Sequence, residues 1–315
     1  MNPLSLQSIQ GQDIALQYVH SYIQKPDTIP PLLIFYGPSG VGKWSTAERF
    51  IYTILCKKNE GCGGCESCRL FLNNQHPDFI LFPENEKILI GKDDEKKLEE
   101  FTVRWLLAKR IPFVPHISKL RIILIPDASL FTDEAESALL KTLEEPPDHT
   151  RFIFLVDDIL KLKQPIVSRA VCIPFLYLSQ SSIKSITNLL PDYLYEKYFG
   201  GSLNPINIPQ PVLDLIESKL ESSIEDSILM LEFETWVRNY KDTHPEWTGD
   251  FDYKIFIEAV LLILMYIVQK SKFQNKYIIL EEIFNTKEIL HFGIANLEIF
   301  LMSRLFYVLQ KQLKN

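Results

Sequence analysis

Short apolar runs alternate with stretches of helical spacing over the first ~175 residues of the chain. The apolar runs are rich in Ile, Leu and Phe and are bounded by Pro, Gly or Asp, as expected of buried strands: PLLIFYG, PDFILFPE, LRIILIPD and TRFIFLVDD. Helical spacing is found in STAERFIYTILC, DDEKKLEEFTVRWLLAKR and TDEAESALLKTLEE. Strands that alternate with helices predict an α/β domain with a largely parallel sheet and helices on both of its faces.

The pattern changes after residue 175, where most of the remaining segments have helical spacing. The segment GGSLNPINIPQP, residues 200–211, is typical of a loop between domains. We therefore expect an α/β domain over residues 1–175, a small helical domain over 176–208 and an all-α C-terminal domain over 209–315. The most apolar segment, residues 255–268, contains Glu258 and is too short to span a bilayer, so it predicts a buried helix.

Composition narrows the functional classes. The chain has 315 residues, of which 46% are hydrophobic, enough for two or three folded domains. Its 33 basic and 40 acidic residues give a formal charge of -7, which argues against tight nucleic-acid binding by this chain alone. The polar start MNPLSLQSIQGQD lacks the pattern of a secretory signal, so we expect a cytoplasmic protein without membrane contact.

The first predicted strand runs into GPSGVGKWS, which nearly matches the phosphate-binding loop pattern of Gly, four residues, Gly-Lys and then Ser or Thr. Gly37, Gly40 and Gly42 allow backbone N–H groups to surround phosphate oxygens, and Lys43 would neutralise their charge. The next residue is Trp44, at the position of the hydroxyl that binds Mg²⁺. The loop therefore predicts a degenerate nucleotide site.

A second magnesium ligand is expected at the end of another strand, and RIILIPDASL is the candidate. Pro126 stands at the position of the metal-binding Asp, and Asp127 at that of the water-activating Glu. Together, Trp44 and Pro126 argue against Mg²⁺ binding and against ATP hydrolysis. Three interpretations stay open: the glycines form only a tight turn, the loop binds ATP or ADP without hydrolysis, or it is an empty relic.

Four of the five cysteines lie in CKKNEGCGGCESC, at Cys56, Cys62, Cys65 and Cys68. Four thiolates can close a tetrahedral shell around Zn²⁺, and such a site is structural because it leaves no position for water. Disulfides and a redox C-x-x-C pair are the alternatives, but an intracellular compartment disfavours the first and the second does not need four cysteines. Cys172 lies far away in a strand-like run, and we expect it to be simply buried.

In their order along the chain, these motifs resemble those of bacterial clamp-loader subunits, which are AAA+ proteins of the DNA polymerase III holoenzyme. The resemblance covers residues ~5–176 and rests on GPSGVGK, the four-cysteine insertion, HPDF, PDASLFTDEAESALLKTLEEPPDHTRFIFLVDD and PIVSRA. It implies an AAA+ P-loop domain with a zinc-binding insertion, a small helical lid domain and a C-terminal helical collar that mediates oligomerisation. Motor subunits (gamma/tau) have an intact loop, whereas delta-prime subunits have lost their nucleotide chemistry, and Trp44 and Pro126 match the second type.

The resemblance also implies a role for SRA, residues 168–170. Delta-prime subunits keep an arginine finger in a Ser-Arg-Cys motif, which Ser168 and Arg169 match and from which Ala170 departs. Arg169 would bind the γ-phosphate of ATP held by the neighbouring motor subunit. On residue type alone, Arg169 would be a surface arginine in an ion pair. The phosphate-sensing position would be Val156 or Asp157, and an acid there would repel phosphate.

We therefore expect a delta-prime-like subunit that is not catalytic alone but belongs to the DNA-directed DNA polymerase III holoenzyme, a nucleotidyltransferase complex of DNA replication. The resemblance implies a hetero-pentamer with gamma/tau motor subunits and delta, which places the sliding clamp on primed DNA. The alternatives are a gamma/tau-like ATPase with an unusual metal shell, and a non-replicative AAA+ scaffold that only binds partners.

Overall fold

The computed structural model describes residues 4–92, 98–187, 201–204, 208–224, 227–243, 247, 251–271, 275–290, 304–309 and 311. Its contacts divide the chain into two compact units, Met1–Tyr177 and Leu178–Asn315. The expected α/β domain, residues 1–175, lies within the first unit. The expected boundary at residue 208 directly follows residues 205–207, which lie outside the described residues, so this boundary stays a prediction.

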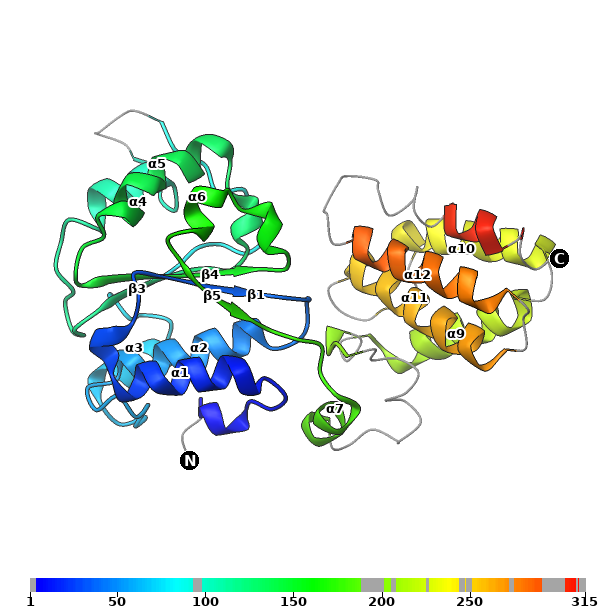
Figure 1. Ribbon diagram of the computed structural model, residues 1–315, viewed down its shortest axis with the longest axis horizontal. Coiled ribbons are helices and arrows are strands. Elements are labelled where there is room, and N and C mark those ends of the chain that lie inside the picture. The colour runs from blue at the N-terminus through cyan, green and yellow to red at the C-terminus, as the bar shows by residue number, and fades with distance from the viewer. Residues whose placement is uncertain are drawn as a thin grey trace. The chain divides into compact units, whose positions relative to one another are not determined.

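A five-stranded sheet forms the centre of the first unit (Figure 1). Its strands are β1 (Leu32–Tyr36), β2 (Phe79–Leu81), β3 (Arg121–Ile125), β4 (Thr150–Val156) and β5 (Val171–Pro174). They lie in the order β2-β3-β4-β1-β5, and each pair of neighbours is parallel. The parallel α/β sheet predicted from the alternating pattern is thereby confirmed.

Helices cover both faces of this sheet (Figure 1). They are α1 (Asp13–Gln24), α2 (Lys43–Leu55), α3 (Glu66–Leu72), α4 (Val103–Lys109), α5 (Asp133–Glu144) and α6 (Gln164–Val167), with the short 3₁₀ helices η1 (Leu6–Ser8), η2 (Pro26–Thr28), η3 (Ala128–Leu130) and η4 (Ile159–Lys161). Leu33 and Phe35 of β1 pack with α1, α2 and α3, whereas Leu32 and Ile34 pack with α4, α5 and α6. Because successive strand residues face opposite sides, one apolar strand supplies both cores.

The helix predicted from DDEKKLEEFTVRWLLAKR is shorter than its pattern. Residues 93–97 lie outside the described residues, and α4 begins only at Val103. Phe101 has a φ of 59°, which a right-handed helix does not allow. The Thr102 hydroxyl then accepts a hydrogen bond from the Trp105 N–H at 3.3 Å and caps the helix. A left-handed residue followed by a cap therefore sets the start of α4.

The parallel arrangement sorts the predicted site residues between two edges of the sheet. All five strands end at one edge, so the loop after β1, the residue Pro126 after β3 and the residue Asp157 after β4 lie near that carboxyl edge. Arg169 precedes β5 and Glu144 precedes β4, so both lie near the opposite, amino edge. The predicted site residues are thus divided between two edges of the sheet, which lie one strand length apart.

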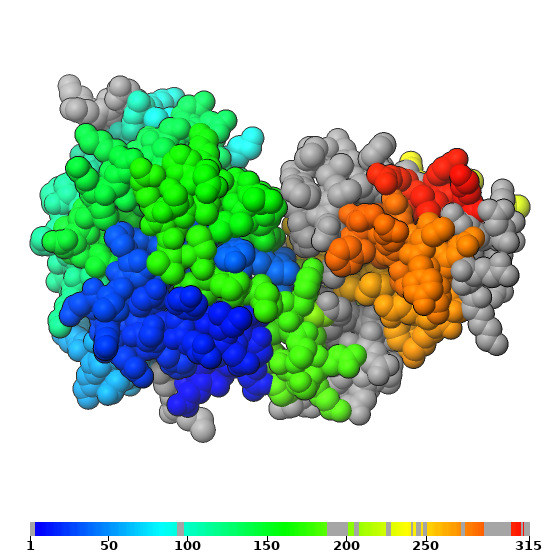
Figure 2. Space-filling model, in the orientation of Figure 1, coloured from blue at the N-terminus to red at the C-terminus, as the bar shows by residue number. Residues whose placement is uncertain are grey.

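The amino-terminal segment packs beside β5. Figure 2 shows the two segments, in blue and green, next to each other on one face of the first unit. Gln12, which is buried, donates from Nε2 to the carbonyl oxygens of Leu176 at 2.7 Å and Val41 at 3.1 Å. Its Oε1 accepts from the Leu176 N–H at 3.1 Å. One amide side chain therefore links the start of α1 to the glycine loop and to the segment after β5.

The described part of the second unit is helical, as predicted. Its helices are α7 (Gln180–Ile186), α9 (Gln210–Ser223), α10 (Ser227–Thr243), α11 (Tyr253–Lys270) and α12 (Lys276–Leu290). The apolar segment 255–268 lies in α11 and is largely buried, and its Glu258 accepts a hydrogen bond from Asn204 at 2.8 Å. Among the described residues, no helix is long and apolar enough to traverse a bilayer. In the segment 295–313, whose spacing is also helical, residues 304–309 and 311 are described and are helical, and the remainder lies outside the described residues.

Candidate functional site

The loop after β1 has a backbone that requires glycine at two positions. Gly37 has a φ of 141°, and a Cβ added there would lie 2.0 Å from the carbonyl oxygen of Phe175. Gly42 has a φ of 101° and is the N-cap of α2. A side chain at either position would clash or strain the backbone. Gly40 also has a positive φ, of 70°. The strand, loop and helix that the phosphate-loop motif requires are therefore all present.

Lys43, the first residue of α2, directs its ammonium back into the loop. Nζ donates to the carbonyl oxygens of Gly37 at 2.6 Å and Pro38 at 2.7 Å, and to Oδ1 of Asp157 at 2.8 Å. The Lys43 side chain is 9% exposed and that of Asp157 is 27% exposed. Of the two residues proposed for the phosphate-sensing position, Val156 is buried within β4, whereas Asp157 contacts Lys43. The lysine of the loop is thus held by the chain's own acceptors.

The two positions expected to bind Mg²⁺ offer no side-chain oxygen. Trp44 is partly buried against the core formed with α1, α2 and α3, and Pro126 directly follows β3. Asp127 Oδ1 accepts hydrogen bonds from the N–H of Ser129 at 2.9 Å and from its hydroxyl at 2.6 Å, and thereby caps η3. The carboxylate that directly follows Pro126 therefore stabilises a turn.

Arg169 lies on the surface, close to the amino edge of the sheet. Its Nη2 donates to Glu144 Oε1 at 2.5 Å and its Nη1 donates to the Pro165 carbonyl at 2.8 Å. The side chains of Arg169 and Glu144 are 34% and 50% exposed. Ser168 donates its hydroxyl to the same Pro165 carbonyl at 3.0 Å. Because the four residues of β5 span about 13 Å, Arg169 is a strand length away from the edge that carries Lys43.

The four clustered cysteines converge as their spacing predicts. The Sγ atoms of Cys56, Cys62, Cys65 and Cys68 all lie within 4.8 Å of one another, and those of Cys56 and Cys65 are 3.9 Å apart. A tetrahedral site with Zn–S bonds of about 2.3 Å requires S–S distances of ~3.8 Å, so the sulfurs fit this ion. None of the five cysteines forms a disulfide. Cys172, which was expected to be buried, is only half-buried, and it is distant from the cluster in sequence.

The environment of the cluster favours thiolate at two of the four sulfurs. Burial alone would raise the pKa of Cys56, yet the backbone N–H groups of Cys62, at 3.4 Å, and Lys58, at 3.5 Å, lower the pKa of this thiol to about 6. The Cys68 N–H, at 3.5 Å, likewise helps to lower the pKa of Cys65 against the effect of burial. Burial instead raises the pKa of Cys68 to about 12. A bound cation would deprotonate such a thiol, as metal ligation requires.

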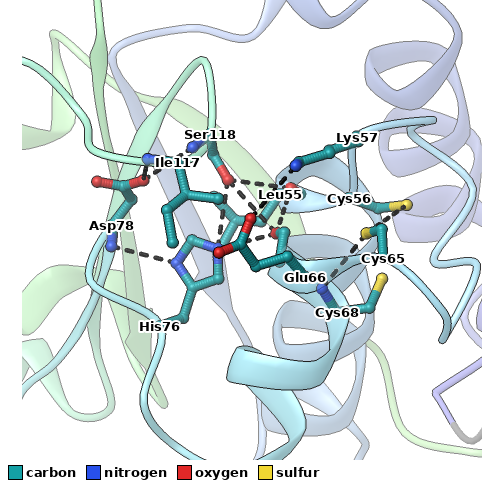
Figure 3. Close-up of polar contacts among 11 residues, drawn as sticks. Leu55, Cys56, Lys57, Cys65, Glu66, Cys68, His76, Asp78, Ile117 and Ser118 are labelled. Atoms are coloured by element: carbon teal, nitrogen blue, oxygen red, sulfur yellow. Dashed lines mark hydrogen bonds and ion pairs between the residues drawn. The ribbon is translucent and has the colours of Figure 1, made fainter.

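A buried hydrogen-bond network joins the cysteine cluster to the sheet (Figure 3). His76 Nδ1 accepts from the Asp78 N–H at 3.1 Å, so in the neutral ring Nε2 carries the proton, and this nitrogen lies 2.8 Å from the Ser67 hydroxyl in α3. Ser67 donates in turn to the Leu55 carbonyl at 2.6 Å. Burial lowers the pKa of His76, against the opposing charge of Asp78. The ring therefore acts as a neutral connector.

Asp78 holds the loop that leads into β3. Its carboxylate is fully buried and accepts from the N–H groups of His116 at 2.6 Å, Ile117 at 2.7 Å and Ser118 at 2.9 Å. Ser118 also donates to the Leu55 carbonyl at 3.0 Å (Figure 3). The HPDF segment thus connects the end of α2, the cysteine module and the sheet.

The sequence predicts no role for Glu144 or for His76. The signal for Glu144 is the pair Pro146-Pro147, which ends α5 before the amino edge of the sheet, where SRA also lies. The signal for His76 is the position of HPDF directly between the cysteine module and β2. The contacts of Glu144 with Arg169 and of His76 with Ser67 can be predicted only when the strand order is known, and no local sequence pattern contains that order.

Comparison with known proteins agrees with these motifs. The family described as DNA polymerase III, delta subunit, matches residues 11–179, which are 169 of the 315 residues. The DNA polymerase III subunit delta' of Pseudomonas aeruginosa is 30% identical over 159 residues, 49% of this chain and 42% of that protein. The DNA polymerase III subunit tau of Escherichia coli is 28% identical over 198 residues, 62% of this chain and 28% of that protein.

A plant protein matches a larger share of the chain. Protein STICHEL of Arabidopsis thaliana is 28% identical over 235 residues, which are 73% of this chain and 18% of that protein. The matched region therefore spans less than half the length of each of these three relatives.

Proposed function

Since this chain belongs to the DNA polymerase III, delta subunit, family of clamp-loader subunits related to gamma and tau, we propose that it acts as a delta-prime-like subunit. In this role it does not hydrolyse ATP itself, and Arg169 acts as an arginine finger on ATP bound by a neighbouring motor subunit. The observation that carries the proposal is the placement of Arg169, exposed and at the sheet edge opposite to its own glycine loop.

The loss of ATPase activity is supported by three side chains at the carboxyl edge. Trp44 and Pro126 supply no oxygen to Mg²⁺, and Asp127 is engaged in capping η3. Phosphoryl transfer in P-loop proteins depends on a metal that bridges the β- and γ-phosphates. A loop that keeps its glycines and lysine without these ligands fits a subunit that retains the architecture and not the reaction.

The finger is supported by chemistry as well as position. A guanidinium is always charged and can bind two phosphate oxygens in one plane. Arg169 cannot serve its own loop from the amino edge, so its natural target is a phosphate presented by another subunit. Its present partner Glu144 is exposed, and exposed ion pairs contribute little free energy, so a phosphate can replace this carboxylate.

The family supports a partnership within a clamp-loader complex. We propose a hetero-pentamer with gamma/tau motor subunits and delta, in which the C-terminal helices of this chain contribute to the collar. The assembly would load the sliding clamp onto primed DNA, and this acidic chain would contribute to that reaction through its neighbours.

The decisive experiment is Arg169→Ala in a loader reconstituted with gamma/tau and delta. DNA-stimulated ATP hydrolysis at the adjoining site should fall by a factor on the order of 10³. Arg69→Ala, which removes an exposed arginine of α3, is the matched control and should keep the wild-type rate. Unchanged turnover with Arg169→Ala would exclude the finger. ATP turnover by the purified chain alone would favour a gamma/tau-like ATPase, and failure to assemble with motor subunits and delta would favour a scaffold.

We further propose that the four clustered cysteines hold a structural Zn²⁺. The ion would supply four bonds between the end of α2, the glycine-rich turn and α3. Protein purified without chelator should contain about one zinc per chain. Cys65→Ser should contain less than half an equivalent, whereas Cys172→Ser, the matched control, should keep the full amount. A wild-type content below half an equivalent would refute the site.

A further inference from the structure

The ammonium of Lys43 has three N–H donors, and the chain provides an acceptor for each of them. These are the carbonyl oxygens of Gly37 and Pro38 and the Asp157 carboxylate, at 2.6, 2.7 and 2.8 Å. In a working loop, the corresponding lysine donates to phosphate oxygens. Here the anionic acceptor comes from the protein.

The position of Asp157 follows from the sheet. Tyr36, at the end of β1, is paired with Val156, at the end of β4, and the Gly37 N–H donates to the Val156 carbonyl at 3.2 Å. Asp157 is the next residue, so adjacent parallel strands bring its carboxylate to the mouth of the loop. The contact is therefore built into the sheet register, and it does not depend on a long or flexible segment.

We propose that Asp157 is an internal anion that takes the place of a phosphate oxygen at Lys43 and closes this loop to nucleoside phosphates. The inference rests on the proposed function, because it explains how a subunit that does not hydrolyse ATP also avoids trapping it. Of the three interpretations that the sequence leaves open, this inference favours the empty relic.

Two physical effects exclude phosphate from the loop. A nucleoside phosphate must displace the Asp157 carboxylate from Lys43, and the pair is largely buried, so water and salt screen it weakly. Any phosphate that approaches the glycines also meets this carboxylate as a like charge at short range. Replacement of Asp157 by Asn removes the charge and keeps the shape, so both effects are lost in one substitution.

The neighbouring residue provides a matched control. Asp158 carries the same charge, but its Oδ1 accepts from the Leu160 N–H at 2.9 Å and caps η4. Asp158→Asn therefore changes the net charge of the chain by the same amount without touching Lys43. A difference between the two variants isolates the contact with the loop from the general charge of the protein.

The test is calorimetric titration of the full chain with ADP, without magnesium because the loop lacks the metal's ligands. Asp157→Asn should bind ADP at least tenfold more tightly than the wild type, and Asp158→Asn should stay within twofold of it. Lys43→Met added to Asp157→Asn should abolish the gain, since the lysine is then missing. Circular dichroism of each variant shows whether it is folded, and Asp157→Ser replaces Asp157→Asn if the latter does not fold.

Three results would overturn the inference: equal ADP affinity in the wild type and Asp157→Asn, an equal gain in Asp158→Asn, or tight ADP binding by the wild type. The Arg169→Ala assay does not involve this loop, so either claim can fail while the other stands. A wild type that binds ADP tightly would leave the finger intact and refute only the internal anion.

Discussion

Lys43 and Arg169 are both cations paired with a carboxylate of the same chain, but the two pairs differ in burial. The Lys43 side chain is 9% exposed and donates to two carbonyl oxygens besides Asp157. Arg169 is 34% exposed and its partner Glu144 is 50% exposed. A buried pair loses much when one member is removed, whereas an exposed pair is worth little and exchanges partners readily. Burial therefore decides which cation is available to an outside anion.

The two pairs also differ in what surrounds them. Lys43 and Asp157 are placed by adjacent strands at the carboxyl edge, where parallel sheets usually hold their ligands. Arg169 and Glu144 lie at the opposite edge, after α6 and at the end of α5. At the carboxyl edge the cation is thus engaged by largely buried acceptors of its own chain, whereas at the amino edge the cation lies in a more exposed pair.

The largest effect on the free energy of unfolding is expected from Lys43→Met. It leaves the Asp157 carboxylate without its partner in a largely buried position, so the free energy of unfolding should fall by about 2 kcal/mol. Urea denaturation of the full chain measures this loss. Adding Asp157→Asn should restore most of it, because no unpaired charge then remains. If Lys43→Met has wild-type stability, the pair of Lys43 and Asp157 stabilises the fold no more than an exposed ion pair does. The contrast drawn between the two pairs would then be wrong.

A smaller loss of stability is expected from acidification, which protonates His76, a buried residue outside both ion pairs. The pKa of His76 lies below the ordinary 6.5 because the ring is buried, so the unfolded chain takes up this proton more readily than the folded chain. The free energy of unfolding should therefore fall as the pH drops below 6.5. His76→Gln should remove this component of the pH dependence, and His116→Gln, at an exposed histidine, should keep it. Equal profiles for both variants would contradict the prediction.

The smallest effect is expected from Glu144→Gln. The exposed pair with Arg169 should contribute less than about 0.5 kcal/mol to the free energy of unfolding. In the reconstituted loader, ATP turnover should stay within about threefold of the wild type, since the finger keeps its charge and its contact with Pro165. A loss of ATP turnover as large as that of Arg169→Ala would mean that Glu144 positions the finger. The two ion pairs would then differ in function and not in burial.

Local patterns predicted most of the first unit. The strands around Ile34, Ile123 and Phe154 were evident because a two-sided sheet needs continuous apolar runs, and the helices at Lys43 and Asp133 because their apolar spacing is periodic. The start of α4 was predicted wrongly, since a left-handed Phe101 leaves no trace in hydrophobic spacing. The convergence of the four cysteines was predictable because short gaps limit how far apart their sulfurs can lie.

The candidate site residues could be recognised from the order of amino acids alone, because the glycine loop, the cysteines and SRA are short contiguous motifs whose chemistry would depend on residue type. The acceptors that Lys43 and Arg169 contact could not be predicted from the sequence. The contacts of Lys43 with Asp157 and of Arg169 with Glu144 join residues 114 and 25 positions apart. Strand order and register create those contacts, and the burial that makes one pair closed and the other open is a property of the packed chain.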